Sequence, residues 1–302
     1  MKSTLRSSLA VLCALGSVSA YALQPLNTDD TGTQGAGGNQ LELSVDRARV
    51  RESGQFGRSG RDRGMETAVT YTRGITETLD VSLGVPYLRN RPGLKDPITG
   101  EHDKNTSGMG NTSISAKWRF FDNEASGTSF AIAPEILIPV SSSRQRDDLG
   151  AGRVSGGVAL LLTQEVPFGA VHVNLGVGKE RMRSLRNVEN PGDRQSAQSN
   201  RTTSFSVAPV WEVTETFQLA LDMGVERVKE GKVTYEDGLG GEDMTRSLSR
   251  TGRFVGLGAI WTPHKDVDLA LGYFRSKMNG SNSHAVATEK EDSIRAGVTF
   301  RF

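Results

Sequence analysis

The sequence predicts an all-β protein, a transmembrane antiparallel β-barrel of about 12 strands with short periplasmic turns and long extracellular loops. Three observations predict this fold. Apolar and polar residues alternate in about twelve separate segments, the connections between these segments alternate between short and long, and the last segment is an amphipathic strand. Alternation with a period of two places the apolar side chains on one face of each strand, as a barrel in lipid requires.

The first 22 residues have the pattern of a secretory signal peptide. Lys2 and Arg6 precede a short apolar run, Leu9–Leu15, and small residues between Val18 and Ala22 offer cleavage sites. The apolar run is too short to cross a bilayer as a helix. We therefore expect residues 1–22 to be cleaved during export.

Residues 23–39 form a Gly-, Thr- and Asp-rich arm without periodicity. We expect this N-terminal arm to lie either in the periplasm or inside the barrel lumen as a plug or gate. Asp29 and Asp30 either bind a cation or cap a turn, and Asp commonly caps turns. We favour an Asx turn in a periplasmic lead, and we expect no metal site and no cofactor.

Residues 40–302 form the predicted barrel, in which we identify twelve candidate strands of about ten residues each. Their apolar positions recur at every second residue, which gives each strand one lipid-facing side. In chain order, the alternating segments are Leu41–Val45, Met65–Tyr71, Leu79–Tyr87, Thr112–Phe120, Phe130–Ile138, Val158–Leu162, Val171–Val177, Phe205–Trp211, Phe217–Val225, Val255–Trp261, Val267–Tyr273 and Ile294–Phe302.

The connections between these segments alternate in length. Short turns on the periplasmic side and long loops outside are typical of outer-membrane barrels, and an even number of strands places both chain ends in the periplasm. The predicted short turns are Gly74–Thr78, Asp122–Gly127, Pro167–Ala170, Thr214–Thr216 and Pro263–Asp266; the predicted long loops are Arg51–Gly64, Asn90–Gly110, Ser141–Arg153, Glu180–Arg201, Lys229–Thr251 and Met278–Lys290.

Aromatic residues mark the two predicted edges of the apolar band. Each of the three tryptophans falls near the periplasmic end of a strand and on its apolar face, where an indole ring has one edge in water. Two tyrosines fall toward the opposite edge. The predicted membrane-interface girdle comprises Trp118, Trp211, Trp261, Phe217, Phe300, Tyr87 and Tyr273.

The last strand resembles the terminal strand of bacterial outer-membrane barrels. Ile294 and every second residue after it are apolar or small, and the strand finishes on Phe302. This resemblance implies that Phe302 belongs to an insertion signal and that the barrel-assembly machinery is a partner.

Composition restricts the possible functions. The chain carries 36 basic and 35 acidic residues, which argues against bulk nucleic-acid binding. The one cysteine, Cys13, lies in the segment that we expect to be removed, so the mature chain would have no disulfide. A mean hydropathy of −0.39 suits both a soluble protein and a barrel, since a barrel is apolar only at alternate positions.

Several motifs resemble an outer-membrane transporter family associated with the meta-cleavage pathway of phenol degradation. They are Pro25–Gly35 followed by Gln40–Leu43, then Gly108–Asn111 leading into Ala116–Arg119, and the closing Val298–Phe302. The block Thr28–Gly32 is the most specific of them, whereas Gln24 departs from the basic residue expected before the proline. The resemblance implies a Gram-negative outer-membrane barrel, porin-like, that carries hydrophobic or aromatic solutes.

Polar residues on the other face of the strands are candidates to line the lumen. One hypothesis is a channel or transporter for the passive passage of small, possibly hydrophobic or aromatic solutes, in which these charges tune selectivity. The alternative is a structural or adhesive barrel whose lumen is filled by ion pairs and whose loops bind surface partners. Small inward residues, such as Gly256 and Gly272, favour room in the lumen. The lumen-lining candidates are Glu42, Glu66, Asp80, Lys117, Arg119, Glu135, His172, Glu212, Asp222, Asp268, Arg295 and Arg301.

The predicted loops are rich in arginine. These side chains either contact lipopolysaccharide phosphates or form a solvated surface, and we keep outer-membrane lipid and lipopolysaccharide as expected partners. The loop arginines are Arg51, Arg58, Arg61, Arg63, Arg144, Arg146, Arg181, Arg183 and Arg186.

Evidence for catalysis is weak, and we expect no enzyme activity. The sequence has no Gly-x-Ser-x-Gly motif and no His-Glu-x-x-His pair. The four histidines, His102, His172, His264 and His284, are scattered along the chain. A lipid-face enzyme remains a third, less favoured hypothesis.

Overall fold

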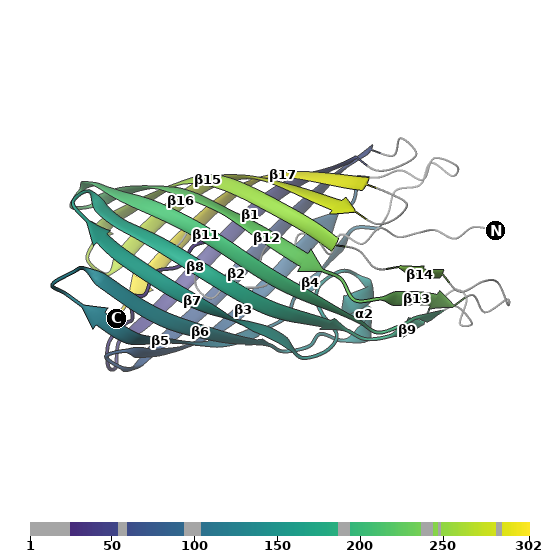
Figure 1. Cartoon of the computed structure of the whole chain (residues 1–302), viewed down its shortest axis with the longest axis horizontal. Helices are drawn as coiled ribbons and strands as arrows, with labels where there is room; N and C mark the ends of the chain where they lie inside the picture. Colours follow the sequence, from purple (N-terminus) through teal and green to yellow (C-terminus); the bar gives the residue numbers. More distant parts are fainter. Residues whose placement is uncertain are drawn as a thin grey trace.

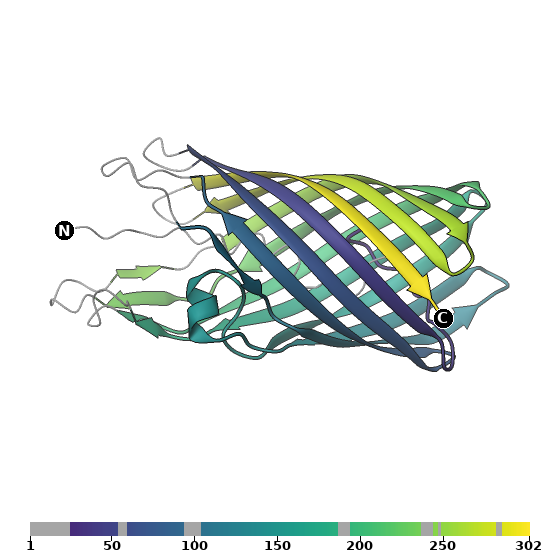
Figure 2. The ribbon, with the colours of Figure 1, turned by 180° about the vertical axis from the view of Figure 1, so that it is seen from behind.

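The computed structural model describes residues 25–53, 59–93, 104–186, 194–236, 244–246, 249–281 and 286–302. The predicted signal peptide, residues 1–22, lies outside the described residues. Most described residues are in strands, and Figures 1 and 2 show the strands tilted steeply around a cylinder. Among the described residues, no helix is long and apolar enough to cross a membrane.

The strands begin and end at well-defined residues. In chain order they are β1 (Asn39–Ser53), β2 (Ser59–Thr76), β3 (Leu79–Arg91), β4 (Thr106–Met109), β5 (Ser113–Asn123), β6 (Thr128–Leu137), β7 (Ser155–Val166), β8 (Gly169–Met182), β9 (Leu185–Arg186), β10 (Arg194–Gln195), β11 (Gln198–Thr214), β12 (Phe217–Lys229), β13 (Val233–Glu236), β14 (Met244–Arg246), β15 (Ser249–His264), β16 (Val267–Ser281) and β17 (Val286–Arg301); one short helix, α2 (Ser142–Arg146), lies between β6 and β7.

Twelve of these strands close into a barrel. The order around the sheet is β2, β1, β17, β16, β15, β12, β11, β8, β7, β6, β5 and β3, and a β2–β3 pairing closes the ring. Strand β4 pairs with β3 beyond the end of β5, and β9, β10, β13 and β14 form a separate small sheet at the long-loop end. All pairings between neighbouring barrel strands are antiparallel, including that of β1 with β17, which lie side by side in Figure 2. The predicted twelve-stranded antiparallel barrel is confirmed.

The structure confirms the alternation of short and long connections but corrects their lengths. Strand β2 has 18 residues and β11 has 17, not the ten that we expected. The predicted long loops Arg51–Gly64 and Met278–Lys290 are therefore mostly strand, because β1 extends to Ser53 and β16 to Ser281. Apolar alternation shows only the lipid-facing part of a strand, whereas backbone pairing continues into the charged extension.

Within its apolar band, the barrel exposes large aliphatic side chains on the outside and buries acidic side chains on the inside. Leu257, Leu271 and Ile294 are 64%, 58% and 56% exposed, whereas Asp80 and Asp222 are buried. A water-soluble protein buries such leucines and exposes such aspartates. The arrangement is that of a sheet whose outer face contacts lipid and whose backbone groups are paired by closure.

The aromatic residues predicted to form a girdle lie on the outer face. Trp118, Trp211 and Trp261 are exposed near the short-turn ends of β5, β11 and β15. Tyr87 and Tyr273 are exposed farther toward the long-loop end. Phe300 is exposed and Phe217 is half-buried, both near the short-turn end. Contact of these rings with a membrane interface stays a prediction.

Candidate functional site: the lumen and its N-terminal arm

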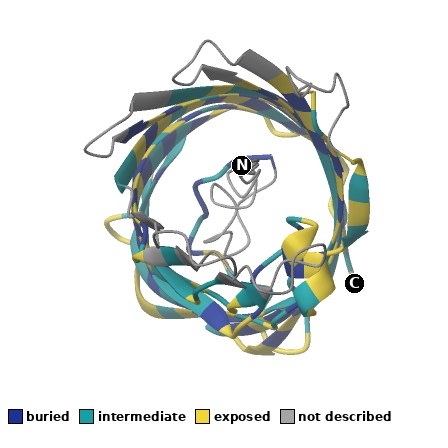
Figure 3. Ribbon diagram, turned by 90° about the vertical axis from the view of Figure 1, so that its right-hand side faces the viewer, coloured by how far each residue is buried: buried dark blue, intermediate teal, exposed yellow. Residues whose placement is uncertain are grey.

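The N-terminal arm lies inside the barrel. Viewed along the barrel, the described part of this segment, residues 25–38, runs within the closed ring (Figure 3). Pro25, Leu26, Thr28, Asp29 and Thr31 are buried. The arm was expected to be a periplasmic lead, and the structure instead places its described part in the lumen, where it bonds to inward side chains of β12, β5 and β3.

Glycines allow the arm to bend where it meets the short-turn end. Gly35 and Gly37 have positive φ angles of 75° and 83°, which side chains with a Cβ rarely adopt. The Gly37 N–H donates to the Gly74 carbonyl at 2.9 Å, and the Gly74 N–H donates to the Gly38 carbonyl at 2.9 Å. A Cβ on Gly74 would lie 1.7 Å from the Gly35 carbonyl oxygen, so only glycine fits where the arm crosses β2.

Asp222 of β12 is the main polar anchor of the arm. Its side chain is fully buried and accepts hydrogen bonds from the Asn27 N–H at 2.5 Å and the Thr28 hydroxyl at 2.6 Å. The Thr28 N–H adds a longer bond of 3.3 Å. Hydrogen bonds to a carboxylate are among the stronger ones in proteins, so this position holds the arm against one wall.

Lys117 of β5 holds the arm from another strand. Its Nζ lies 2.9 Å from a carboxylate oxygen of Asp29 and 3.4 Å from one of Asp30. Burial raises the pKa of Asp30, but Lys117 and His172 lower it, and the net pKa lies below its ordinary value. Asp29 and Asp30 both lie within ion-pair distance of Lys117, and Asp30 also accepts a turn hydrogen bond from the Gly32 N–H at 2.8 Å.

Further bonds connect the arm to other strands around the ring. The Thr31 N–H donates to the Thr163 hydroxyl of β7 at 3.1 Å, and the Gln34 N–H donates to Asp80 of β3 at 3.0 Å. Arg295 of β17 donates to the Asn27 side chain at 2.5 Å. The arm therefore crosses the lumen and is attached to walls that face one another.

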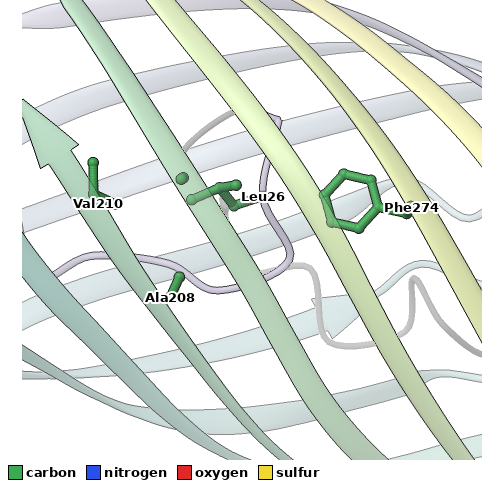
Figure 4. Close-up of a cluster of buried hydrophobic side chains, with 5 residues drawn as sticks. Leu26, Ala208, Val210 and Phe274 are labelled. Atoms are coloured by element: carbon green, nitrogen blue, oxygen red, sulfur yellow. The ribbon is translucent and has the colours of Figure 1, made fainter. Parts of the chain in front are cut away.

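An apolar cluster completes the docking of the arm. Leu26 packs with Ala208, Val210, Ala220 and Phe274, which come from β11, β12 and β16 (Figure 4). Burial of a leucine side chain contributes about 1.5–3 kcal/mol. The arm is therefore held by both polar and apolar contacts.

The inward glycines leave room for this cluster. A Cβ on Gly256 would lie 2.2 Å from the Phe274 ring, and a Cβ on Gly224 would lie 2.5 Å from the Phe254 ring. A Cβ on Gly258 would lie 2.9 Å from Leu26. Our expectation that small inward residues leave the lumen open is therefore wrong at these positions, because two aromatic rings and the arm fill the space.

The predicted lumen-lining residues fall into three groups by burial. Glu212 is exposed, because it lies at the short-turn end of β11, where a bulge interrupts the pairing with β12. Whether any of them selects a solute stays a prediction. The buried residues are Glu42, Asp80, Lys117, Glu135, His172 and Asp222, and the half-buried ones are Glu66, Arg119, Asp268, Arg295 and Arg301.

Only some of these residues contact the arm. Asp80, Lys117, Asp222 and Arg295 bond to it directly, as described above. The others have partners on the wall itself, or lie in the wall without an arm contact among the described residues. Arg301 pairs with Asp268, Arg119 lies 3.3 Å from Asp122, His172 Nδ1 lies 3.0 Å from the Thr163 hydroxyl, and Gln40 donates to Glu42 at 2.9 Å.

Sequence reasoning missed Phe254 and Phe274. They line a small cavity of about 60 Å³ together with Asn27, Glu226 and Glu291. The Arg295 guanidinium lies 4.3 Å from the centre of the Phe274 ring, an arrangement that stabilises the cation. The signal was available, since Phe254 and Phe274 occupy inward positions beside glycines.

The described residues contain no group of three or more His, Asp or Glu side chains that is arranged to hold a metal ion. Two histidines are described. His172 is buried in the lumen wall, and His264, the exposed last residue of β15, lies 3.4 Å from Asp266. His102 and His284 lie outside the described residues.

Comparison with known proteins identifies the family and agrees with the fold. The family model described as "Putative MetA-pathway of phenol degradation" matches residues 27–282. An outer-membrane channel from Pseudomonas putida F1 is similar in structure, with a TM-score of 0.60 and 13% identity over 90% of this chain and 98% of that chain. The translocator domain of the autotransporter NalP from Neisseria meningitidis has a TM-score of 0.51 and 16% identity, over 90% and 91%. No curated protein matches the sequence.

Proposed function

The chain belongs to the family of the MetA pathway of phenol degradation, and from this premise we propose that it is an outer-membrane channel for small hydrophobic or aromatic solutes, whose lumen is controlled by the N-terminal arm. The observation that carries the proposal is the arm itself. It crosses a closed barrel and is held by side chains from strands on different sides of the ring.

The proposed passage is passive. Leu26 and Phe274 are buried against each other while the arm is docked, and release of the arm would expose Phe274 and Phe254 to an apolar solute in the lumen. The name of the similar channel from Pseudomonas putida and the family description support this function. We also propose export by the signal peptide, residence in the outer membrane, and no catalytic role.

A second candidate function has one observation in its favour. The contacts of the arm are numerous enough to keep the lumen filled, as a structural or adhesive barrel would require. Conductance separates the two hypotheses, because a permanently filled barrel conducts no ions.

The test is a deletion of residues 23–38 in mature protein refolded into planar bilayers. We expect the deletion to increase single-channel conductance or the time spent open, because it removes the segment that crosses the lumen. The matched control is Asp268→Asn, since Asp268 bonds to Arg301 and Thr262 of the wall and to no described arm residue. A deletion variant that still conducts nothing would exclude the channel, and one that conducts like the intact protein would exclude control by the arm.

The solute is tested separately. Cells that lack the gene should grow more slowly on aromatic carbon sources supplied at low concentration, and complementation should restore the growth rate. Equal growth of both strains on every aromatic source tried would argue against this solute class.

A further inference from the structure

On part of the outer face of the barrel, the side chains change from apolar to basic between one row of paired residues and the next. Strands β16, β17, β1, β2 and β3 are neighbours, and their register places residues in rows across the wall. The last row without a charged residue is Leu271, Ala296, Val45, Thr67 and Tyr87. Toward the long-loop end, the first basic row is Tyr273, Ile294, Arg47, Met65 and Arg89, and the second is Arg275, Asp292, Arg49, Arg63 and Arg91. The third basic row is Lys277, Lys290, Arg51 and Arg61.

We name the six arginines of the first two basic rows the arginine wall: Arg47, Arg49, Arg63, Arg89, Arg91 and Arg275. All six side chains are exposed. Together with Tyr273 and Met65, they line an open pocket of about 500 Å³ on the outside of the barrel.

The arginine wall contains too few acidic side chains to neutralise its arginines. In these rows of described residues, the only acid is Asp292, which lies 2.8 Å from Arg275 and 3.8 Å from Arg51. Arg49, Arg63 and Arg91 stand directly opposite one another on neighbouring strands, and they form no ion pair with any described residue. Like charges at such positions repel, so the wall gains stability when an external anion lies between them.

The position of the wall indicates the kind of anion. It begins at the edge of the apolar band, where the headgroups of the surrounding leaflet would lie if the barrel sits in the outer membrane as proposed above. Guanidinium groups bind phosphate through paired hydrogen bonds. The apolar row beneath offers a surface for acyl chains.

We propose that the arginine wall is a binding site for the phosphate groups of a phosphorylated glycolipid, of the lipid A type, in the outer leaflet. One lipid molecule then contacts both the arginine wall and the apolar row beneath it. Its phosphates lie among the arginines, and its acyl chains lie against the apolar row. Of the loop arginines expected to contact lipopolysaccharide, Arg63 belongs to this wall and Arg51 and Arg61 lie in the row above it. Arg58 lies outside the described residues.

The test measures the affinity of the refolded full-length mature chain for purified bis-phosphorylated lipid A, through the shift that the lipid causes in the thermal transition on heat-modifiability gels. We expect the triple variant Arg49→Gln, Arg63→Gln, Arg91→Gln to bind at least about tenfold more weakly than the wild type, or about 1.4 kcal/mol. The corresponding triple lysine variant should fall between them, since it keeps the charge but loses the paired hydrogen bonds.

The matched control is Arg201→Gln, Arg227→Gln, Arg253→Gln, which removes three exposed arginines from the wall formed by β11, β12 and β15. This variant should bind lipid A like the wild type. At equal concentration, dephosphorylated lipid A and inorganic phosphate should each raise the thermal transition of the wild type less than bis-phosphorylated lipid A does. The first lacks the phosphates and the second lacks the acyl chains.

Three results would overturn the proposal: equal loss of binding in both glutamine variants, equal binding of dephosphorylated lipid A, or equal stabilisation by inorganic phosphate. Single-channel conductance is read in the same variants and should not change, because none of the substituted residues faces the lumen. Loss of lipid A binding with normal conductance supports the lipid A site and says nothing about the channel. The lipid A site and the channel can therefore be refuted independently of each other.

Discussion

Asp222→Ala provides the sharpest test of control by the arm. The substitution removes the acceptor of two short hydrogen bonds, from the Asn27 N–H at 2.5 Å and the Thr28 hydroxyl at 2.6 Å. A hydrogen bond to a charged group contributes about 1.5–3 kcal/mol. Taking the lower value for each bond gives about 3 kcal/mol, without the longer bond from the Thr28 N–H.

A loss of about 3 kcal/mol shifts the equilibrium between docked and released arm by about 100-fold, at 1.4 kcal/mol for each factor of ten. The measurement is the open probability of single channels in planar bilayers. We expect the open probability to rise by the same factor as this equilibrium, up to the limit at which the channel is open for most of the time. The Asp268→Asn variant should behave like the wild type.

A cysteine pair provides the converse test. Cys13 lies in the predicted signal peptide, so Thr28→Cys with Asp222→Cys would create the only thiols of the mature chain. Oxidation should hold the arm in place and suppress conductance, and reduction should restore it. If Asp222→Ala conducts like the wild type while the oxidised pair also conducts, the arm does not control passage and our reasoning is refuted.

Three further predictions concern the ion pair of the arm, the packing of the lumen and the lipid-facing surface. Lys117→Met leaves two arm carboxylates without their cation and should weaken docking by about 3–5 kcal/mol, measured as a rise in open probability; adding Asp29→Leu should reverse part of the effect, and no reversal would contradict a direct ion pair. Gly256→Leu should destabilise the protein by about 1–3 kcal/mol in urea unfolding, because its Cβ would overlap an aromatic ring. Gly252→Ala on the same strand should have little effect, since the nearest neighbour of the new Cβ, at 3.2 Å, is the flexible end of a methionine. Leu257→Arg, at a 64% exposed outward position, should cost about 2–4 kcal/mol in folding into lipid, and an unchanged folding equilibrium would show that this position does not face the bilayer core.

The fold was predictable because lipid contact imposes a simple rule on the sequence. Leu257, Leu271 and Ile294 must be apolar, and their inward neighbours need not be, so a period of two appears in the barrel strands. The same rule explains why strand length was underestimated. Beyond Val45 the outward positions of β1 become arginine, but pairing with β2 and β17 continues.

The arrangement of the lumen was only partly predictable. Alternation placed Lys117 and Asp222 on the inner face, but it gives no information about what they contact. The arm has no periodicity, and its partners are far away in the chain, 88 residues for Asp29 with Lys117 and 194 for Thr28 with Asp222. The space left by glycine is ambiguous from sequence alone, because a ring from a neighbouring strand and a solute can fill it equally well.

The long-range anchors of the arm also constrain the order in which the barrel assembles. The arm is synthesised before any strand, yet Asn27 bonds to Arg295, 268 residues later, on the strand that pairs with β1 to close the ring. Contacts between such distant parts of a chain form late and slowly. We infer that the arm already lies within the curling sheet when the first and last strands meet, since after closure it could enter only through an end of the barrel. A variant whose arm cannot bind should complete this final step faster than the intact protein, although its native state would be less stable.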